Sequence, residues 1–185
     1  MNTKNGLALT LIFGGLMLAA APSQAQLRAG NWELGFGLGA TRFDSNLDED
    51  NETEIRQELR GGYLLTDRFE LEAQVSRADA ALGATFDAAM LNAVFNFGGT
   101  RAAVPYILAG VGAARIEDVP FSFENKEGIE EQGLAVQAGI GTRLFFGASR
   151  RVAARLEASV LSEELLEERG EHLSVTAGLV WRIGQ

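Results

Sequence analysis

Large apolar residues alternate with small or polar ones along residues 173–183, close to the end of the chain. Successive side chains of an extended strand point to opposite faces, so this segment would have one apolar and one polar face. Seven earlier segments show the same period of two, which predicts eight strands with unlike faces. The predicted strands are approximately residues 31–43, 54–65, 68–79, 85–97, 105–117, 134–146, 152–161 and 172–183.

The first 25 residues have the pattern of a cleaved export signal rather than of a strand. Lys4 is followed by a mostly apolar run over residues 6–21, and Ser23-Gln24-Ala25 offers small residues at the two positions that a signal peptidase reads. We therefore expect a signal peptide at residues 1–25 and a single mature domain at residues 26–185.

Composition excludes several classes of function. The chain has no cysteine, which excludes disulfides, thiol catalysis and a lipid anchor on cysteine. Its 25 acidic residues outnumber its 16 basic ones, so a nucleic-acid partner is not expected. No later run of about eighteen apolar residues follows the signal, so only strands could cross a membrane. We predict no cofactor and no metal.

The connections between predicted strands alternate in length. Those at residues 66–67, 98–104 and 147–151 are short, whereas those at 44–53, 118–133 and 162–171 are longer and acidic; residues 80–84 form the shortest member of the second group. In outer-membrane barrels short turns face the periplasm and longer loops face outside. This pattern predicts an up-and-down barrel with both termini on the short-turn side. Residues 162–171 could instead extend their strands or form a short helical loop.

Alternation alone does not separate a membrane barrel from a soluble lipocalin-like one, and three further observations favour the membrane. Glycines 35, 37, 39, 139 and 141 lie on the polar face, where a narrow eight-stranded barrel needs room. The apolar face holds few charges, as lipid requires. Aromatic residues gather near the short turns, as in an interfacial girdle. They are Trp32, Tyr63, Phe69, Phe95, Phe97, Tyr106, Phe145, Phe146 and Trp181.

This orientation predicts that Leu34, Leu71 and Leu156 face lipid while Arg60 and Glu157 face the lumen. Two strands are less regular. In residues 105–117 the charged residues at the end of the segment, Arg115 and Glu117, are taken to face inward. This phase makes Tyr106, Leu108 and Ile116 the outward set. Asp87 breaks the phase of residues 85–97 and suggests a bulge there.

Ten charged residues are predicted to share the inward face, where buried charges must pair because an unpaired one is costly to desolvate. A structural ion-pair network that plugs the lumen is the favoured interpretation, and a gated, narrow ion path through exchangeable pairs is the alternative. The predicted lumen network is Arg56, Glu58, Arg60, Glu70, Glu72, Arg115, Arg143, Arg155, Glu157 and Arg182.

The end of the chain resembles the C-terminal assembly signal of outer-membrane barrels, with Thr176, Gly178, Trp181 and Ile183 at the positions that define it. Ile183 stands where phenylalanine is usual, and two residues follow it. The run at residues 105–112 also resembles a strand of small OmpA-like, porin-family β-barrels. The resemblance implies an all-β, eight-stranded antiparallel transmembrane barrel in the outer membrane of a Gram-negative cell. It also implies contact with outer-membrane lipid and lipopolysaccharide, insertion by the barrel-assembly machinery, and a monomer.

His172-Leu173-Ser174 has the spacing of the membrane-facing pair in lipid A deacylases of similar size. Alternation places both side chains on the polar face instead, and no acidic residue follows them. We therefore expect no enzyme, and a lipid A-modifying activity stays the lesser alternative.

The longer loops carry many carboxylates, which could share divalent cations with lipopolysaccharide phosphates but are more typical of a solvated surface. Together these features predict a structural, envelope-integrity or surface-interaction role with an unidentified external partner. The loop carboxylates are Asp44, Asp48, Glu49, Asp50, Glu52, Glu124, Glu127, Glu130, Glu131, Glu163, Glu164, Glu167 and Glu168.

Overall fold

The computed structural model describes residues 27–44, 53–79, 85–98, 102–117, 130–147, 149–165 and 168–184. The predicted signal peptide lies outside these residues. Eight strands account for most of the described chain. They are β1 (Trp32–Asp44), β2 (Thr53–Leu64), β3 (Phe69–Asp79), β4 (Thr85–Asn96), β5 (Ala103–Glu117), β6 (Glu130–Phe146), β7 (Val152–Leu165) and β8 (Glu168–Ile183).

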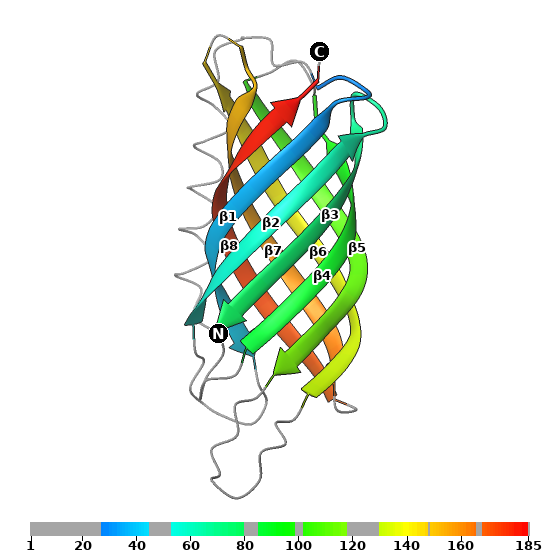
Figure 1. The fold of residues 1–185 in the computed structure, drawn as a ribbon, viewed down its shortest axis with the longest axis vertical. Helices are drawn as coiled ribbons and strands as arrows, with labels where there is room; N and C mark the ends of the chain where they lie inside the picture. Colours follow the sequence, from blue (N-terminus) through cyan, green and yellow to red (C-terminus); the bar gives the residue numbers. More distant parts are fainter. Residues whose placement is uncertain are drawn as a thin grey trace, which may run out of the picture.

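Each strand pairs antiparallel with its neighbours in the sequence, and β1 pairs with β8 to close the barrel (Figure 1). The closing seam runs from Trp32 opposite Ile183 to Asp44 opposite Glu171. Closure gives every strand two hydrogen-bonded neighbours, which lipid requires because it offers no partner to an open edge. The predicted all-β, up-and-down barrel is confirmed. Among the described residues, no helix has the length and apolar character needed to cross a membrane.

The observed strands differ from the predicted ranges mainly at the ends that adjoin the long loops. β7 continues to Leu165 and β8 begins at Glu168, so the segment between the predicted strands extends them and forms no helix in its described part. The predicted bulge at Asp87 is wrong. The register runs unbroken through this residue, with Arg77 opposite Asp87 on one side and Arg115 on the other.

Apart from β5, the orientation of the strands matches the prediction. Leu34 and Leu71 are 53% and 43% exposed, whereas Arg60 and Glu157 are buried. Leu156 is partly exposed on the same outward phase. A lipocalin-like barrel would reverse this arrangement, so the soluble alternative is excluded by the side-chain directions.

The aromatic girdle is smaller than predicted, because Tyr106 and Phe145 point into the barrel and are almost fully buried. Trp32, Phe69 and Trp181 are exposed on the outward face near the short turns. The phase of β5 is therefore opposite to the predicted one. An inward Tyr106 is accommodated because Gly141, opposite it on β6, leaves the space that its ring occupies.

Candidate functional site: an ion-pair network inside the barrel

Arg60 on β2 is the centre of the charged interior. Its guanidinium donates two hydrogen bonds of 2.9 Å to Glu58, one of 2.9 Å to Glu72 and one of 2.7 Å to Glu157. Glu58 lies on the same strand two residues away, whereas Glu157 is on β7, on the far side of the lumen. One arginine thus connects three carboxylates from three strands.

Arg155 on β7 forms the second centre and shares two carboxylates with Arg60. It donates to Glu72 at 2.5 Å and to Glu157 at 2.7 Å. Its Nε also donates to the hydroxyl of Tyr106 at 2.7 Å, and that hydroxyl donates in turn to Glu157 at 2.7 Å. The tyrosine ring lies 4.7 Å from the Arg155 guanidinium, a distance suited to a cation–π contact.

A second group of charges lies nearer the short turns and is built on Arg143 of β6. This arginine contacts Glu70 at 2.7 Å and Glu33 at 3.1 Å, and it donates to Asn96 at 2.6 Å. Glu33 also receives Arg182 at 3.2 Å, and thereby joins β1, β6 and β8. The arginines of the two groups lie over the Tyr106 ring at similar distances of 4.7 and 4.8 Å, so the groups meet at this tyrosine.

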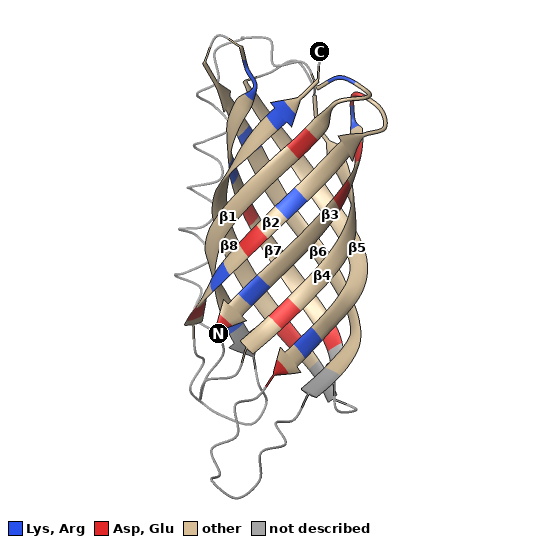
Figure 2. Ribbon diagram, viewed as in Figure 1, with Lys and Arg blue, Asp and Glu red and all other residues tan. Residues whose placement is uncertain are grey.

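The charges inside this network balance. Burial of an arginine without a counterion would cost several kcal/mol of folding free energy, and pairing with a carboxylate offsets this cost. The pairing also fixes the positions of both side chains. Figure 2 colours all charged positions of the described chain, which lie on both near and far strands of the barrel. The described, buried members are the cations Arg56, Arg60, Arg143, Arg155 and Arg182 and the anions Glu33, Glu58, Glu70, Glu72 and Glu157.

A layer of amide side chains borders the network. Gln74 donates to Glu58 at 3.3 Å, Asn92 donates to Gln74 at 2.9 Å, and Gln137 donates to Gln74 at 3.2 Å. These bonds run from β2 to β6 across the lumen. The amides extend the polar cross-links without adding charge.

Apolar side chains fill the barrel on both sides of the charged zone. Near the short turns, Leu27 packs with Leu64, Val104, Phe145 and Ala153. Leu27 precedes β1 and is 2% exposed, so the segment before the first strand helps to close this end. Towards the long loops the cluster comprises Ala78, Phe86, Ala88, Met90, Ala114, Ala135 and Leu161, with Ile116 packed against it.

Of the ten predicted lumen charges, Arg115 is the one that the structure contradicts. Its side chain is 40% exposed and forms an ion pair with Glu117. Ala114 beside it is buried and Ile116 packs inward, which leaves Arg115 on the outward face. The other nine predicted residues lie inside the barrel.

The predicted network left out several polar members of this interior, among them Glu33, Gln74, Asn92 and Tyr106. Alternation placed Glu33, Gln74 and Asn92 opposite the apolar residues of their strands, but it gave no reason to join them to the network. Alternation did not place Tyr106 inside, because its strand was assigned the opposite phase.

His172 and Ser174 lie inside the lumen and not against lipid. The His172 ring is 2.8 Å from Glu163 and packs beside Phe86. Ser174 receives Arg56 at 3.0 Å and is 2.8 Å from the hydroxyl of Thr41. Both residues therefore tie strands together, and neither is placed to meet an acyl ester in the membrane.

The residues of the predicted assembly signal divide between the two faces. Thr176 is buried inside, and Trp181 and Ile183 are 63% and 49% exposed outside. Gly178 lies inward opposite Gly37 of β1. A side chain at residue 178 would meet the Phe36 carbonyl and the Gly37 Cα at 2.8 Å, so the glycine pair lets β8 and β1 close the barrel.

The acidic loop residues lie mostly outside the described part of the chain. Within that part, no cluster of three or more histidine and carboxylate ligands could hold a metal ion. Glu163 is the described loop carboxylate with a defined contact, to His172. The carboxylates outside the described residues are Asp48, Glu49, Asp50, Glu52, Glu124, Glu127 and Glu167.

The fold is shared with known outer-membrane barrels. The family model for the outer membrane protein β-barrel domain matches residues 11–181. Neisserial surface protein A superposes with a TM-score of 0.70 at 10% identity, covering 82% of this chain and 98% of that one. OprG of Pseudomonas aeruginosa gives 0.58 at 13% identity, with 88% and 100% covered. The N-terminal barrel of OprF from the same species gives 0.54 at 18% identity, with 83% and 98% covered. No curated protein sequence matches the chain.

Proposed function

Because the chain belongs to the outer membrane protein β-barrel domain family, and is therefore a protein of the cell outer membrane, we propose that it is a structural, non-conducting barrel of the envelope. In this role the barrel stabilises the membrane around it and presents its longer loops outside the cell. The observation that carries the proposal is the closed network of Arg60, Arg155 and their shared carboxylates across the middle of the lumen.

Conduction would require these contacts to open. An ion that entered the lumen would have to replace bonds of 2.5–2.9 Å among the buried side chains of Arg60, Arg155 and Glu72. It would then meet the apolar cluster around Leu27 and Phe145, which offers no ligand to a charge. Two unlike barriers in series support a closed barrel.

Conductance of the purified barrel in a planar bilayer tests this proposal. We expect no steady current from the wild type. The double variant Arg60→Ala, Arg155→Ala is the informative companion, because it removes the two central cations while leaving the apolar end in place. A stable, ohmic conductance of the wild type would instead support the alternative of a narrow ion path.

The same geometry supports a non-enzymatic role. His172 is engaged with Glu163, and Ser174 is engaged with Arg56 and Thr41, all inside the barrel. Mass analysis of lipid A from cells with and without the gene tests this point, and loss of an acyl chain that depends on His172 would contradict it.

The structural role is tested with a deletion strain, which should admit large antibiotics more readily. Restoration of that barrier by a chain with shortened loops would assign the structural role to the barrel itself.

A further inference from the structure

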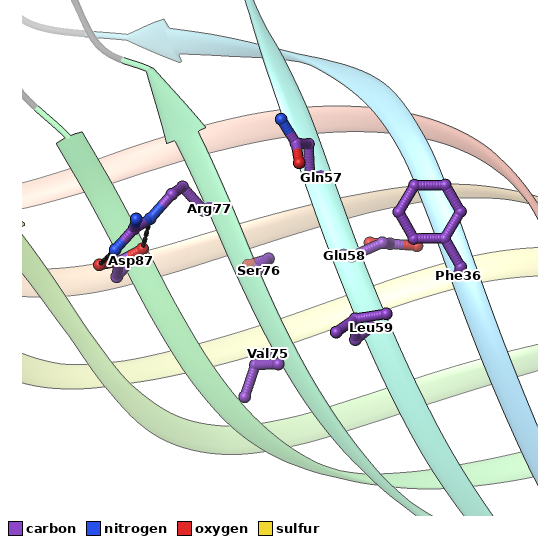
Figure 3. Close-up of a pocket in the computed structure, with 8 residues that line it drawn as sticks. All are labelled: Phe36, Gln57, Glu58, Leu59, Val75, Ser76, Arg77 and Asp87. Carbon is purple, nitrogen blue, oxygen red and sulfur yellow. Dashed lines mark hydrogen bonds and ion pairs between the residues drawn. The ribbon is translucent and has the colours of Figure 1, made fainter.

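Two adjoining grooves mark the outward face of the barrel. The first, of about 320 Å³, is lined by Phe36, Leu59, Val75, Arg77 and Asp87 among others. The second, of about 380 Å³, lies over the neighbouring strands and shares Val75 and Asp87 with it. Figure 3 shows the first groove, with Arg77 reaching across from β3 to Asp87 on β4.

The floor of both grooves is one continuous row of paired residues on neighbouring strands. The row is large at its β1 end and small at its β5 end, where two alanines lie side by side. It forms an apolar floor on the outward face of the barrel. The row comprises Phe36, Leu59, Val75, Ala89 and Ala113 on β1 to β5.

A polar row lies directly above this floor, two residues closer to the long loops on each strand. It contains two cations and one anion, with a glutamine at each end. This row departs from the rest of the outward face, where apolar residues dominate the described strands. Its members are Gln57, Arg77, Asp87, Arg115 and Gln132 on β2 to β6.

The height of Arg77 places it at the outer polar boundary of the membrane. Phe69 lies in the aromatic zone by the short turns, and the strand from residue 69 to 77 rises roughly 20 Å for a step of about 3.3 Å and a tilt of about 40°. This height approaches the apolar band of about 25 Å in such barrels. Arg77 therefore lies close to the headgroup boundary, while Val75 and the floor lie deeper in the apolar band.

Arg77 retains donors for a ligand. Its Nε and Nη2 each donate to Asp87 at 2.7 Å, and its Nη1 makes no hydrogen bond within the described residues. The side chain is 62% exposed, so Nη1 is accessible from outside. Asp87 fixes the plane of the guanidinium, which suits the recognition of a phosphate by paired N–H groups.

We propose that the two grooves and the polar row bind one phosphorylated, multiply acylated glycolipid of the outer leaflet, the lipid A part of lipopolysaccharide. Arg77 contacts a phosphate with Nη1, and an acyl chain lies along the floor over Val75, Ala89 and Ala113. This assignment depends on the outer-membrane location and does not depend on whether the lumen conducts.

Binding of purified lipid A to the full-length barrel in detergent, counted by native mass spectrometry, tests the headgroup contact. We expect Arg77→Gln to weaken binding about tenfold, as loss of one charge-assisted hydrogen bond predicts. Dephosphorylated lipid A should bind the wild type with a similar loss. Arg68→Gln is the matched control, because Arg68 is an exposed arginine at the short-turn end just before β3, and it should leave binding unchanged.

Val75→Trp tests the floor by filling both grooves, and Leu179→Trp on β8 is its control on the lipid-facing surface. Only the first should weaken lipid A binding. Gel mobility without heating confirms that each variant is folded. The proposal is overturned if phosphorylated and dephosphorylated lipid A bind equally, or if Arg77→Gln and Arg68→Gln have the same effect on lipid A binding. It is also overturned if inorganic phosphate displaces the lipid while Val75→Trp leaves binding unchanged. A dimer of the barrel that Val75→Trp dissociates would show that this surface binds a second copy of the chain, and this result would also overturn the proposal.

Discussion

Replacing Arg60 with methionine measures how much the lumen network stabilises the barrel. Methionine keeps an unbranched apolar stem but removes every bond to Glu58, Glu72 and Glu157. Glu72 and Glu157 keep Arg155 as a partner, whereas Glu58 retains only Arg56 at 3.9 Å and a bond from Gln74. Most of the cost should therefore come from the stranded Glu58 carboxylate.

The size of the effect follows from burial. Removing one partner of a buried ion pair typically costs about 3–5 kcal/mol, because an uncompensated charge remains. Arg60→Met should lower the free energy of unfolding by that amount. Adding Glu58→Met removes the stranded charge, so the double variant should be more stable than the sum of the two single changes predicts, by at least about 1 kcal/mol.

Urea unfolding of the barrel in detergent, followed by the fluorescence of Trp32 and Trp181, gives these free energies. The control is Arg77→Met, which breaks a pair of equally short bonds to Asp87 on the exposed face. Exposed pairs contribute little because water solvates the separated charges well. If Arg60→Met and Arg77→Met shifted the unfolding midpoint equally, burial would not be the source of the stability and the reasoning would be refuted.

Three further changes probe separate parts of the interior. Tyr106→Phe removes the hydroxyl between Arg155 and Glu157 and should cost about 1–3 kcal/mol in the same urea assay, with an unchanged midpoint as the contrary result. Gly178→Ala should lower the folded fraction seen by unheated gel mobility, whereas Gly61→Ala, whose nearest neighbour would be 3.8 Å away, should not; equal folding would contradict the close approach at the seam. Leu27→Ala should lower stability by about 2–5 kcal/mol if the segment before β1 closes the short-turn end, and no change would show that it does not.

Alternation predicted the strands and their facing directions because a closed barrel in lipid leaves little freedom in either. Leu34 and Arg60 belong to opposite faces, because a register slip of one residue that brought them together would turn one strand's apolar residues into the lumen. The partners of Arg60 could not be predicted in the same way. Arg60 and Glu157 are 97 residues apart in the sequence. Which inward charges meet depends on the tilt of the strands and the stagger of their register, and the sequence pattern specifies neither.

Arg115 shows where reasoning from charge fails and why. A charged residue was taken to mark the inward face, and this rule holds at the middle of the membrane, where an outward arginine or lysine costs roughly 2–4 kcal/mol. Near the interface the same exposure costs only about 0–1 kcal/mol. Arg115 lies two residues from the end of β5, where that penalty no longer selects a face. Tyr106, near the other end of the same strand, was then assigned outward by the phase of Arg115, so one charge at a strand end inverted the whole strand. The phase of a membrane strand is better read from its central residues, and a charge at its end is better treated as a candidate contact with lipid headgroups.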